Sequence, residues 1–527
     1  MVAAYGIGSL MLKKILKIKL KVVGGILLIL LLVQLISAYF FGVMAEKQLD
    51  LQFKYITDTS LIKVVSRDYN RGWLTSNESV VLSVNNQVLK NVLAILPGAN
   101  AHESINALAN GTYQIHYTTK ITHGLFAGWL HGTFIPTLAY ASTDIVFPEK
   151  IDKLLTKFFA SKKPLEINNV IYLNKSGRYV VYSPGFGYDE ALSGVKINWG
   201  GLYLKIAYNP EFNYFKNDLS APLFELSAPT KGEFVFNGFE YASDSRYSVN
   251  NIKVGTTALK LANLRVAMVE SNSVGLRFGE MVHALVGVNS ADFLNGIDVI
   301  NPANFQIQNV VYNALSKDEN NFFSAAAKAG FESLTSNNRK YGPMNFDLSL
   351  NHISSPEFSK LLDNLNDTAG QDQTDQLSRD KTIAMLKTYL TPIFVQQPEV
   401  ILNGFSLVTP DGVISLSGRA TTINFESSDM QDQAAFMKKM SANMKFSVPK
   451  SVLAYFFILQ MKYFLTAGNA QMDQQSSDAL AKVVNILLDN QLHVWLKKGF
   501  LMQKESMISS TISLESGVVY LNGIPTK

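Results

Sequence analysis

A long uncharged apolar segment near the N-terminus constrains this chain more than any other feature. Residues 22–43 read VVGGILLILLLVQLISAYFFGV, and only Gln34 and Ser37 interrupt the apolar run. At about 1.5 Å per residue, a helix of this length reaches across a hydrocarbon core of about 30 Å. The segment therefore predicts a transmembrane anchor.

The residues before this segment predict its orientation. Residues 1–21 contain five lysines, at positions 13, 14, 17, 19 and 21, and no acidic residue. By the positive-inside rule this basic tail stays in the cytoplasm and the rest of the chain crosses the membrane. The five lysines also account for the whole formal net charge of +5. The rest of the chain is formally neutral, so we expect no nucleic-acid partner.

A cleavable signal peptide is the alternative interpretation, since Val43-Met44-Ala45 offers small residues near a cleavage position. Signal peptides have shorter apolar cores, of about 7–15 residues. The length therefore favours a retained anchor. Leu49, Phe53 and Ile56 continue a helical spacing beyond it, and this spacing predicts a short stalk over residues 44–64.

The composition of the remaining chain excludes several kinds of site. There are no cysteines, which rules out disulfides, thiolate metal ligands and cysteine nucleophiles, and is compatible with export to an oxidising compartment. Charged residues make up only 17%, while the chain holds 32 Phe and 22 Tyr. Such a composition is typical of sheet rather than of helices rich in ion pairs.

The pattern predicts an α+β fold, mainly antiparallel β, as an extended, strongly curved sheet or meander with flanking helices. Short strand-like segments separated by Gly, Pro and Asn recur through residues 165–278, as expected for a meander. We predict a β-rich region over residues 65–300 and an α+β region over residues 301–527, which is either separate or continuous with the preceding sheet. Hairpins are expected at Gly200-Gly201, Asn237-Gly238 and Thr409-Pro410-Asp411-Gly412. Helices are expected near residues 87–96, 149–160, 320–334, 355–365, 376–395, 429–443, 450–465 and 476–493.

The sequence contains no established catalytic or metal-binding motif. His102-Glu103 lacks the second histidine of a zincin helix, and Gly185-Phe186-Gly187 lacks the third glycine of a dinucleotide loop. His116 and His123 lie seven residues apart near one strand, so they point to opposite faces rather than to a shared metal. We therefore expect no cofactor, no metal and no enzymatic activity. A hydrolase with two carboxylates far apart in the sequence stays open as an alternative.

Two short segments stand out beside the expected strands, Tyr69–Ser76 and Ile121–Phe126. The glycines suit a bulge or tight turn, the aromatic residues suit a core, and the arginine suits an ion pair. We expect these residues to be structural. The candidate site residues are Tyr69, Arg71, Gly72, Trp73, His123, Gly124 and Phe126.

These segments also carry a family resemblance. Tyr69, Arg71 and Gly72 match the Tyr-x-Arg-Gly segment of the YdgA-like bacterial envelope proteins. Their second motif resembles hydrophobic-Asp-His-Gly-Pro-Phe, and His123, Gly124 and Phe126 match it. Thr122 and Leu125 depart from the Asp and Pro of that motif. Residues 445–452 and the closing residues around Gly517 and Asn522 are similar as well. The resemblance implies a single-pass inner-membrane protein with a periplasmic body and no assigned catalytic residues, and it allows a homodimer.

Three functions follow as hypotheses. The first is binding or scaffolding in the cell envelope, with an envelope protein as partner. The second is binding or transfer of a lipid or another hydrophobic ligand along an apolar β groove, which the aromatic-rich meander beside the anchor favours. The third is the envelope hydrolase with dispersed carboxylates.

Overall fold

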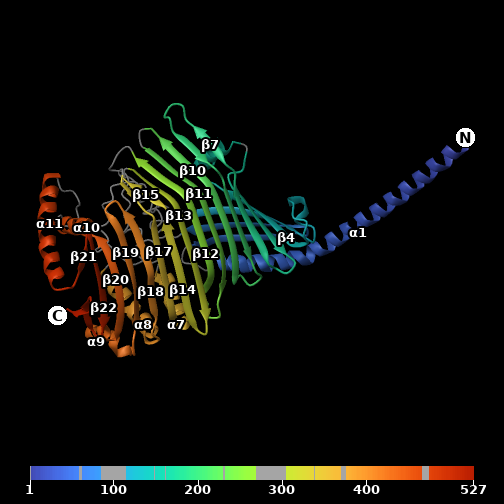
Figure 1. The fold of residues 1–527 in the computed structure, drawn as a ribbon. Coiled ribbons are helices and arrows are strands. Elements are labelled where there is room, and N and C mark those ends of the chain that lie inside the picture. Colours follow the sequence, from blue (N-terminus) through green and yellow to red (C-terminus); the bar gives the residue numbers. More distant parts are fainter. Residues whose placement is uncertain are drawn as a thin grey trace.

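One continuous antiparallel sheet forms most of the molecule, and a long helix extends from one end of it (Figure 1). The computed structural model describes residues 2–57, 62–84, 114–147, 149–160, 162–229, 232–268, 304–336, 339–368, 376–465 and 474–526. This arrangement confirms the predicted fold class, which is mainly antiparallel β with flanking helices.

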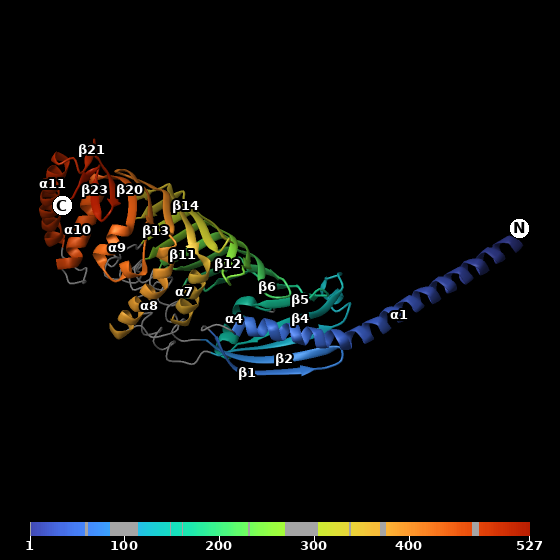
Figure 2. The ribbon, with the colours of Figure 1, turned by 90° about the horizontal axis from the view of Figure 1, so that it is seen from below.

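The N-terminal helix α1 runs without a break from Val2 to Thr57. It contains the apolar segment and also the residues expected to form a stalk. Residues 25–55 include a window with a mean hydropathy of 2.6, and α1 is the one helix in the described ranges that is long and apolar enough to cross a membrane. Its N-terminal part projects away from the body, and its C-terminal part lies along strands β1 to β5 (Figure 2).

In the N-terminal half, the order of the strands in the sheet is close to their order in the sequence. Neighbours pair in the order β1, β2, β3, β4, β5, β6, β9, β10, β11 and β12. Their bounds are β1 Ile62–Arg71, β2 Thr75–Val84, β3 Gln114–His123, β4 Thr137–Val146, β5 Glu166–Tyr172, β6 Gly177–Ser183, β7 Phe186–Asp189, β8 Lys196–Trp199, β9 Leu202–Tyr208, β10 Tyr214–Ala228, β11 Gly232–Tyr247 and β12 Lys253–Met268. The short helices here are η1, Trp129–His131, and α4, Glu149–Phe159.

The sheet continues without interruption into the C-terminal half, in the order β12, β13, β14, β17, β18, β19, β20 and β22. The strands are β13 Asn304–Glu319, β14 Phe322–Phe331, β15 Ser333–Ser336, β16 Arg339–Tyr341, β17 Met344–Ser354, β18 Glu399–Thr409, β19 Gly412–Thr422, β20 Met440–Pro449, β21 Met502–Lys504, β22 Met507–Glu515, β23 Val518–Leu521 and β24 Ile524–Pro525. The helices are α7 Ser355–Thr368, α8 Gln376–Val395, η2 Ser427–Met430, α9 Gln433–Lys439, α10 Lys450–Leu465 and α11 Gln474–Lys497.

Of the three expected hairpins, one is confirmed and two are wrong. Pro410 and Asp411 connect the paired strands β18 and β19, as predicted. Gly200-Gly201 joins β8 to β9, but both of these strands pair with β10 rather than with each other. Asn237-Gly238 lies inside β11, where the pairing with β12 skips from Asn237 to Glu240. In both places glycine marks an irregularity within a long strand, which is its other common use in sheets.

Two predicted helices are also wrong. Residues 322–331 form strand β14 rather than a helix, because β13 and β17 pair with it on both sides and this pairing outweighs the helix propensity of its alanines. Residues 429–443 divide into the end of η2, α9 and the start of β20. The other predicted helices are confirmed as α4, α7, α8, α10 and α11, while residues 87–96 and the strand expected at 273–278 lie outside the described residues.

Three apolar clusters hold helices against the sheet. Ala45 and Leu49 of α1 pack with Ile121 of β3, Ala141 of β4 and Ile171 of β5. The helices α7 and α8 cover residues of β14 and β17 through a second cluster, which includes Leu361 and Ile393. The third cluster joins α10 and α11 to β20 and β22. Figure 2 shows α7 and α8 together on one side of the sheet.

Candidate functional site: a collar on the helix and an apolar row on the sheet

The two segments singled out in the sequence meet on helix α1. We call this arrangement the collar, defined as residues 72–75, from the end of β1 to the first residue of β2, together with residues 123–137, from the last residue of β3 to the first residue of β4. The Trp73 indole Nε1 donates to the carbonyl of Leu35 at 2.9 Å. The Gly72 N–H donates to the carbonyl of Thr75 at 3.0 Å, which closes the turn that carries Trp73.

Gln34 and Ser37, the polar interruptions of the apolar segment, bond directly to the collar. The Gln34 Nε2 donates to the carbonyl of His123 at 2.9 Å, and its Oε1 accepts from the Phe126 N–H at 3.0 Å. The Leu125 N–H donates to the Ser37 Oγ at 3.3 Å. Gly124 has a φ of +114°, and a side chain there would collide with Gln34. The glycine is therefore required both by the backbone conformation and by the close approach of the helix.

His123 is completely buried where the collar contacts the helix. A side chain at Gly42 would lie 2.7 Å from the His123 Nδ1, so the absence of one lets the imidazole pack directly on the helix. Neither ring nitrogen has a hydrogen-bond partner among the described residues. Burial lowers the pKa of His123 below its ordinary value. The arrangement suits a neutral packing residue.

Acidification is expected to loosen the collar through His123. The unfolded chain would protonate this imidazole near its ordinary pKa of about 6.5, whereas the folded chain resists protonation. The free energy of unfolding should therefore fall as the pH drops below about 6.5. Thermal melts between pH 7.5 and 5.5 would measure this loss, which should be smaller in a His123→Leu variant. An equally steep loss in both proteins would contradict the assignment.

Tyr69 and Arg71 face the same helix from β1. The Arg71 Nη1 bonds to the Glu46 carboxylate at 2.8 Å, and Tyr69 packs against the α1 cluster. Arg67, on the same strand, forms ion pairs with Asp50 of α1, at 2.8 Å, and with Glu78 of β2, at 2.7 Å. Glu46, Asp50 and Glu78 are therefore paired with arginines. The pairs with Glu46 and Asp50 attach the helix to the sheet. The phenol of Tyr69 has a raised pKa, chiefly because of burial.

A buried polar network further along α1 was not identified from the sequence. The Gln52 Oε1 accepts from the Tyr179 hydroxyl at 2.6 Å and from the Asn169 Nδ2 at 3.0 Å, while its Nε2 donates to the Tyr208 hydroxyl at 2.7 Å. The Tyr208 hydroxyl in turn donates to the Asn169 Oδ1 at 2.8 Å. Gln52, Asn169 and Tyr208 are each 3% exposed or less. The network attaches α1 to strands β5, β6 and β9.

Beyond α1, a row of apolar side chains crosses the sheet at right angles to the strands. Residues directly opposite each other on antiparallel strands lie on the same face of the sheet. The strand register alone therefore defines the members of the row. We call this set the apolar row. Its members are Ile167, Val181, Leu204, Leu219, Tyr241, Leu259, Tyr312, Ala329, Phe346, Phe405, Leu416 and Phe446.

The apolar row lies on the face that carries the helices. Its first member, Ile167, is two residues from Asn169, which bonds to α1, and its last member, Phe446, packs into the α10–α11 cluster. All members are half-buried except Tyr312, which is 37% exposed. The row therefore extends from α1 to α10 and α11. The described residues leave its side chains partly exposed to solvent.

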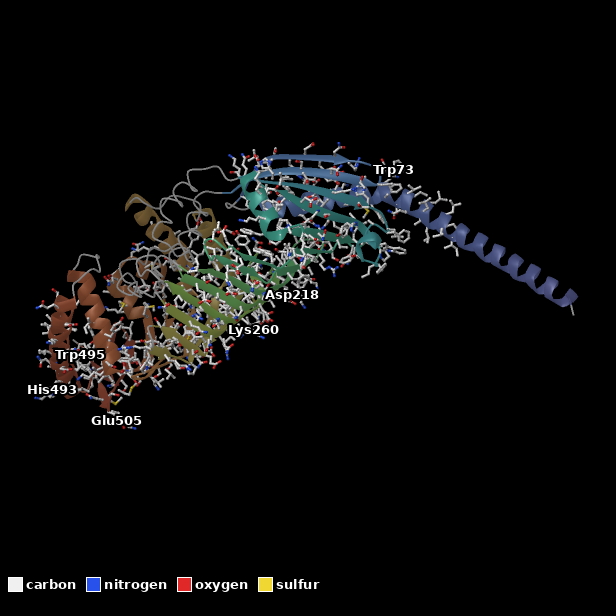
Figure 3. All side chains as sticks on the ribbon, turned by 90° about the horizontal axis from the view of Figure 1, so that it is seen from above. Trp73, Asp218, Lys260, His493, Trp495 and Glu505 are labelled. Atoms are coloured by element: carbon white, nitrogen blue, oxygen red, sulfur yellow. The ribbon has the colours of Figure 1, made fainter. Side chains whose placement is uncertain are left out.

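The opposite face of the same strands is polar at the level of the apolar row. The neighbouring cross-strand row there contains Lys205, Asp218, Asn313, Lys328 and Asp347. Lys328 and Asp347 form an ion pair at 3.2 Å. Figure 3 labels Asp218 and Lys260, which belong to this polar face by register. At this level the sheet thus has one face with charged side chains, which water solvates, and one face that can hold an apolar ligand.

The side chains of His116, His131 and Phe126 each contact a neighbouring residue rather than one another. His116 lies beside Gln114, with a ring nitrogen 3.3 Å from its Oε1, and His131 stacks on the Tyr140 ring at 3.9 Å between ring centroids. The ring of Phe126 lies 4.5 Å from that of Trp129. Within the described ranges, no three His, Asp or Glu residues are grouped so as to hold a metal ion. His102 lies outside these ranges.

Comparison with known proteins places the chain in a bacterial family. A family model described as "Bacterial protein of unknown function (DUF945)" matches residues 18–527. No curated protein and no solved structure shows a significant match. The YdgA-like resemblance is compatible with this family.

Proposed function

The chain belongs to the bacterial DUF945 family, and we propose that it is a single-pass inner-membrane protein that binds lipid acyl chains along the apolar row. The apolar helix and the basic tail before it support an anchor with a cytoplasmic N-terminus and a periplasmic body. A binding function fits a site that is built of apolar side chains and contains no grouped metal ligands among the described residues.

The observation that carries this proposal is the continuity of the apolar row. Strands lie about 4.8 Å apart, so the row extends for about 50 Å. Single exposed apolar residues are normal on a protein surface, but a contiguous apolar surface of this length marks an interaction site. A lipid acyl chain is long, narrow and apolar, and it matches a narrow track better than a compact ligand does.

The position of the row supports movement of lipid away from the membrane. Ile167 lies on β5, whose residues Asn169 and Ile171 contact the C-terminal half of α1. From there the row crosses successive strands to Phe446, beside α10 and α11. A ligand on the row would therefore pass from the anchored end of the body to the opposite end.

Photo-crosslinking in living cells tests the proposal directly. The photoreactive residue p-benzoylphenylalanine would replace Phe346, a row member on β17, and in a matched variant Asn345, its neighbour on the polar face. We expect a lipid adduct by mass spectrometry at position 346 and none at position 345. The absence of a lipid adduct at position 346 would refute the proposal.

Scaffolding is the second candidate function, and exposed apolar residues on α10 and α11 favour it. Tyr455, Ile486 and Leu487 are 60%, 62% and 55% exposed. Exposed apolar side chains gathered on neighbouring helices are typical of a protein-binding surface, and a second copy of the chain is the partner we propose for it. With the photoreactive residue in place of Tyr455, an adduct with a second copy of the chain would favour this function.

A further inference from the structure

The outer edge of the collar is apolar and exposed. Trp73, Trp129, Phe134 and Ile135 are 59%, 41%, 75% and 60% exposed, and Leu74 beside them is 42% exposed. We call these five residues the collar tip. Residues 72–75 and 124–137, which carry them, contain no Asp, Glu, Lys or Arg. Water is therefore an unfavourable environment for this edge.

The length of the apolar helix indicates what covers the tip. The first hydrogen bonds between the described part of the helix and the collar are made by Gln34, and residues 22–33 form only about 18 Å of helix. A hydrocarbon core of about 30 Å is longer than this by about 12 Å. Counting the helix to Phe40 gives about 28 Å, which matches the core. Residues 34–40, and the collar beside them, thus fall within the outer part of the bilayer.

The exposed side of the helix agrees with this depth. Ile36, Tyr39 and Phe40 of the helix are 61%, 46% and 61% exposed. The Trp73 ring lies 5.1 Å from the Tyr39 ring. Large apolar and aromatic side chains at one level are typical of the region where a bilayer meets water. The first acidic residue of the chain, Glu46, follows only after this level.

The hydrogen bonds between the collar and α1 satisfy part of what that environment requires. Irregular backbone is tolerated at membrane depth only where its polar groups are paired within the protein. Gln34 pairs the carbonyl of His123 and the N–H of Phe126, Ser37 pairs the N–H of Leu125, and the indole N–H of Trp73 bonds to the helix. These bonds also explain why an apolar membrane helix carries a glutamine.

We propose that the collar tip is inserted into the outer leaflet of the membrane, where it holds the body directly on the lipid surface. The occupant of this apolar edge is the bilayer itself, since the edge lies against the helix that crosses it. The inference rests on the proposed membrane anchor and its orientation, and it does not depend on lipid binding by the apolar row.

Single cysteines give a direct test, because the natural chain contains none. Phe134→Cys places a thiol on the tip, and Leu192→Cys places one on a loop residue that is 101% exposed. The full chain would be reconstituted into phosphatidylethanolamine–phosphatidylglycerol vesicles and treated with a membrane-impermeant maleimide. We expect Cys at 134 to react at least tenfold more slowly than Cys at 192, and both to react alike after denaturation in SDS. Equal rates in intact vesicles would overturn the proposal.

Tryptophan quenching distinguishes lipid from a protein cover. The chain has four tryptophans, so a variant with Trp199→Phe and Trp495→Phe reports from Trp73 and Trp129 alone. Vesicles of brominated phosphatidylcholine should quench this variant strongly. A control that keeps only Trp495, at the far end of the body (Figure 3), should be quenched little. Slow labelling at position 134 without quenching of Trp73 and Trp129 would also overturn the proposal, because a protein would then cover the tip.

Discussion

Replacing Gln52 by leucine is expected to release the C-terminal half of α1 from the sheet. The variant leaves the Tyr179 hydroxyl and the Asn169 amide as donors without their acceptor. A buried polar group that loses its partner costs about 1–3 kcal/mol, so the free energy of opening should fall by about 2–6 kcal/mol. This is a large share of the 5–15 kcal/mol that stabilises a typical domain.

Hydrogen exchange followed by mass spectrometry measures this opening for residues 45–57. A loss of about 2 kcal/mol corresponds to exchange roughly 30-fold faster, since 1.4 kcal/mol is tenfold. Leu51→Gln is the matched control, because Leu51 is the adjacent residue and is 52% exposed. It should leave the exchange nearly unchanged. Unaltered protection in Gln52→Leu would show that the apolar cluster around Ala45 and Leu49 holds the helix without the network.

Local sequence patterns predict those elements that a short stretch of chain determines by itself. The apolar helix follows from residues 22–43 alone, and Pro410-Asp411 specifies the turn between its two flanking strands. The meander was recognisable because turn residues recur at short intervals. One local signal was overlooked: Asn320 and Asn321 have φ of +55° and +63°, as in a tight hairpin turn. An Asn-Asn pair of this kind predicts a hairpin, in which the residues that follow it pair as a strand with the residues before it.

The collar depends on a contact that spacing in the sequence does not reveal. The candidates on the β1–β2 turn and on the β3–β4 loop have α1 as their common partner, and Gln34 of this helix is bonded to residues about 90 positions later. Gln34 and Ser37 were visible only as interruptions in an apolar helix. A polar side chain in a membrane helix needs a partner, so these interruptions were the available signal for a contact there.

The apolar row depends on register, which is a non-local property. Apolar and polar residues alternate along each strand. A shift of one residue in the pairing register would move every apolar side chain of that strand to the other face of the sheet. The bulge between Asp347 and Leu348, for example, decides which residues of β18 lie opposite Phe346. Only the pairing of all these strands shows that their apolar positions fall in one line.

A glutamate in the middle of the apolar row is expected to abolish most acyl-chain binding. Tyr312 on β13 is the most exposed member of the row, so Tyr312→Glu can place its carboxylate in water without unfolding the strand. A bound acyl chain would have to cross this charge. Loss of contact over only two methylenes is worth about 1.6 kcal/mol, or about 15-fold in affinity. The lipid retained per purified chain, measured by mass spectrometry, should fall by about tenfold or more.

Asn313→Glu is the control that separates the row from general effects of added charge. Asn313 is the next residue of the same strand, lies on the polar face and is paired with Lys328, whose charge favours a carboxylate there. This variant should retain as much lipid as the natural chain. Equal retention in the two variants would remove the apolar row as the binding surface, because the only difference between them is the face that carries the charge.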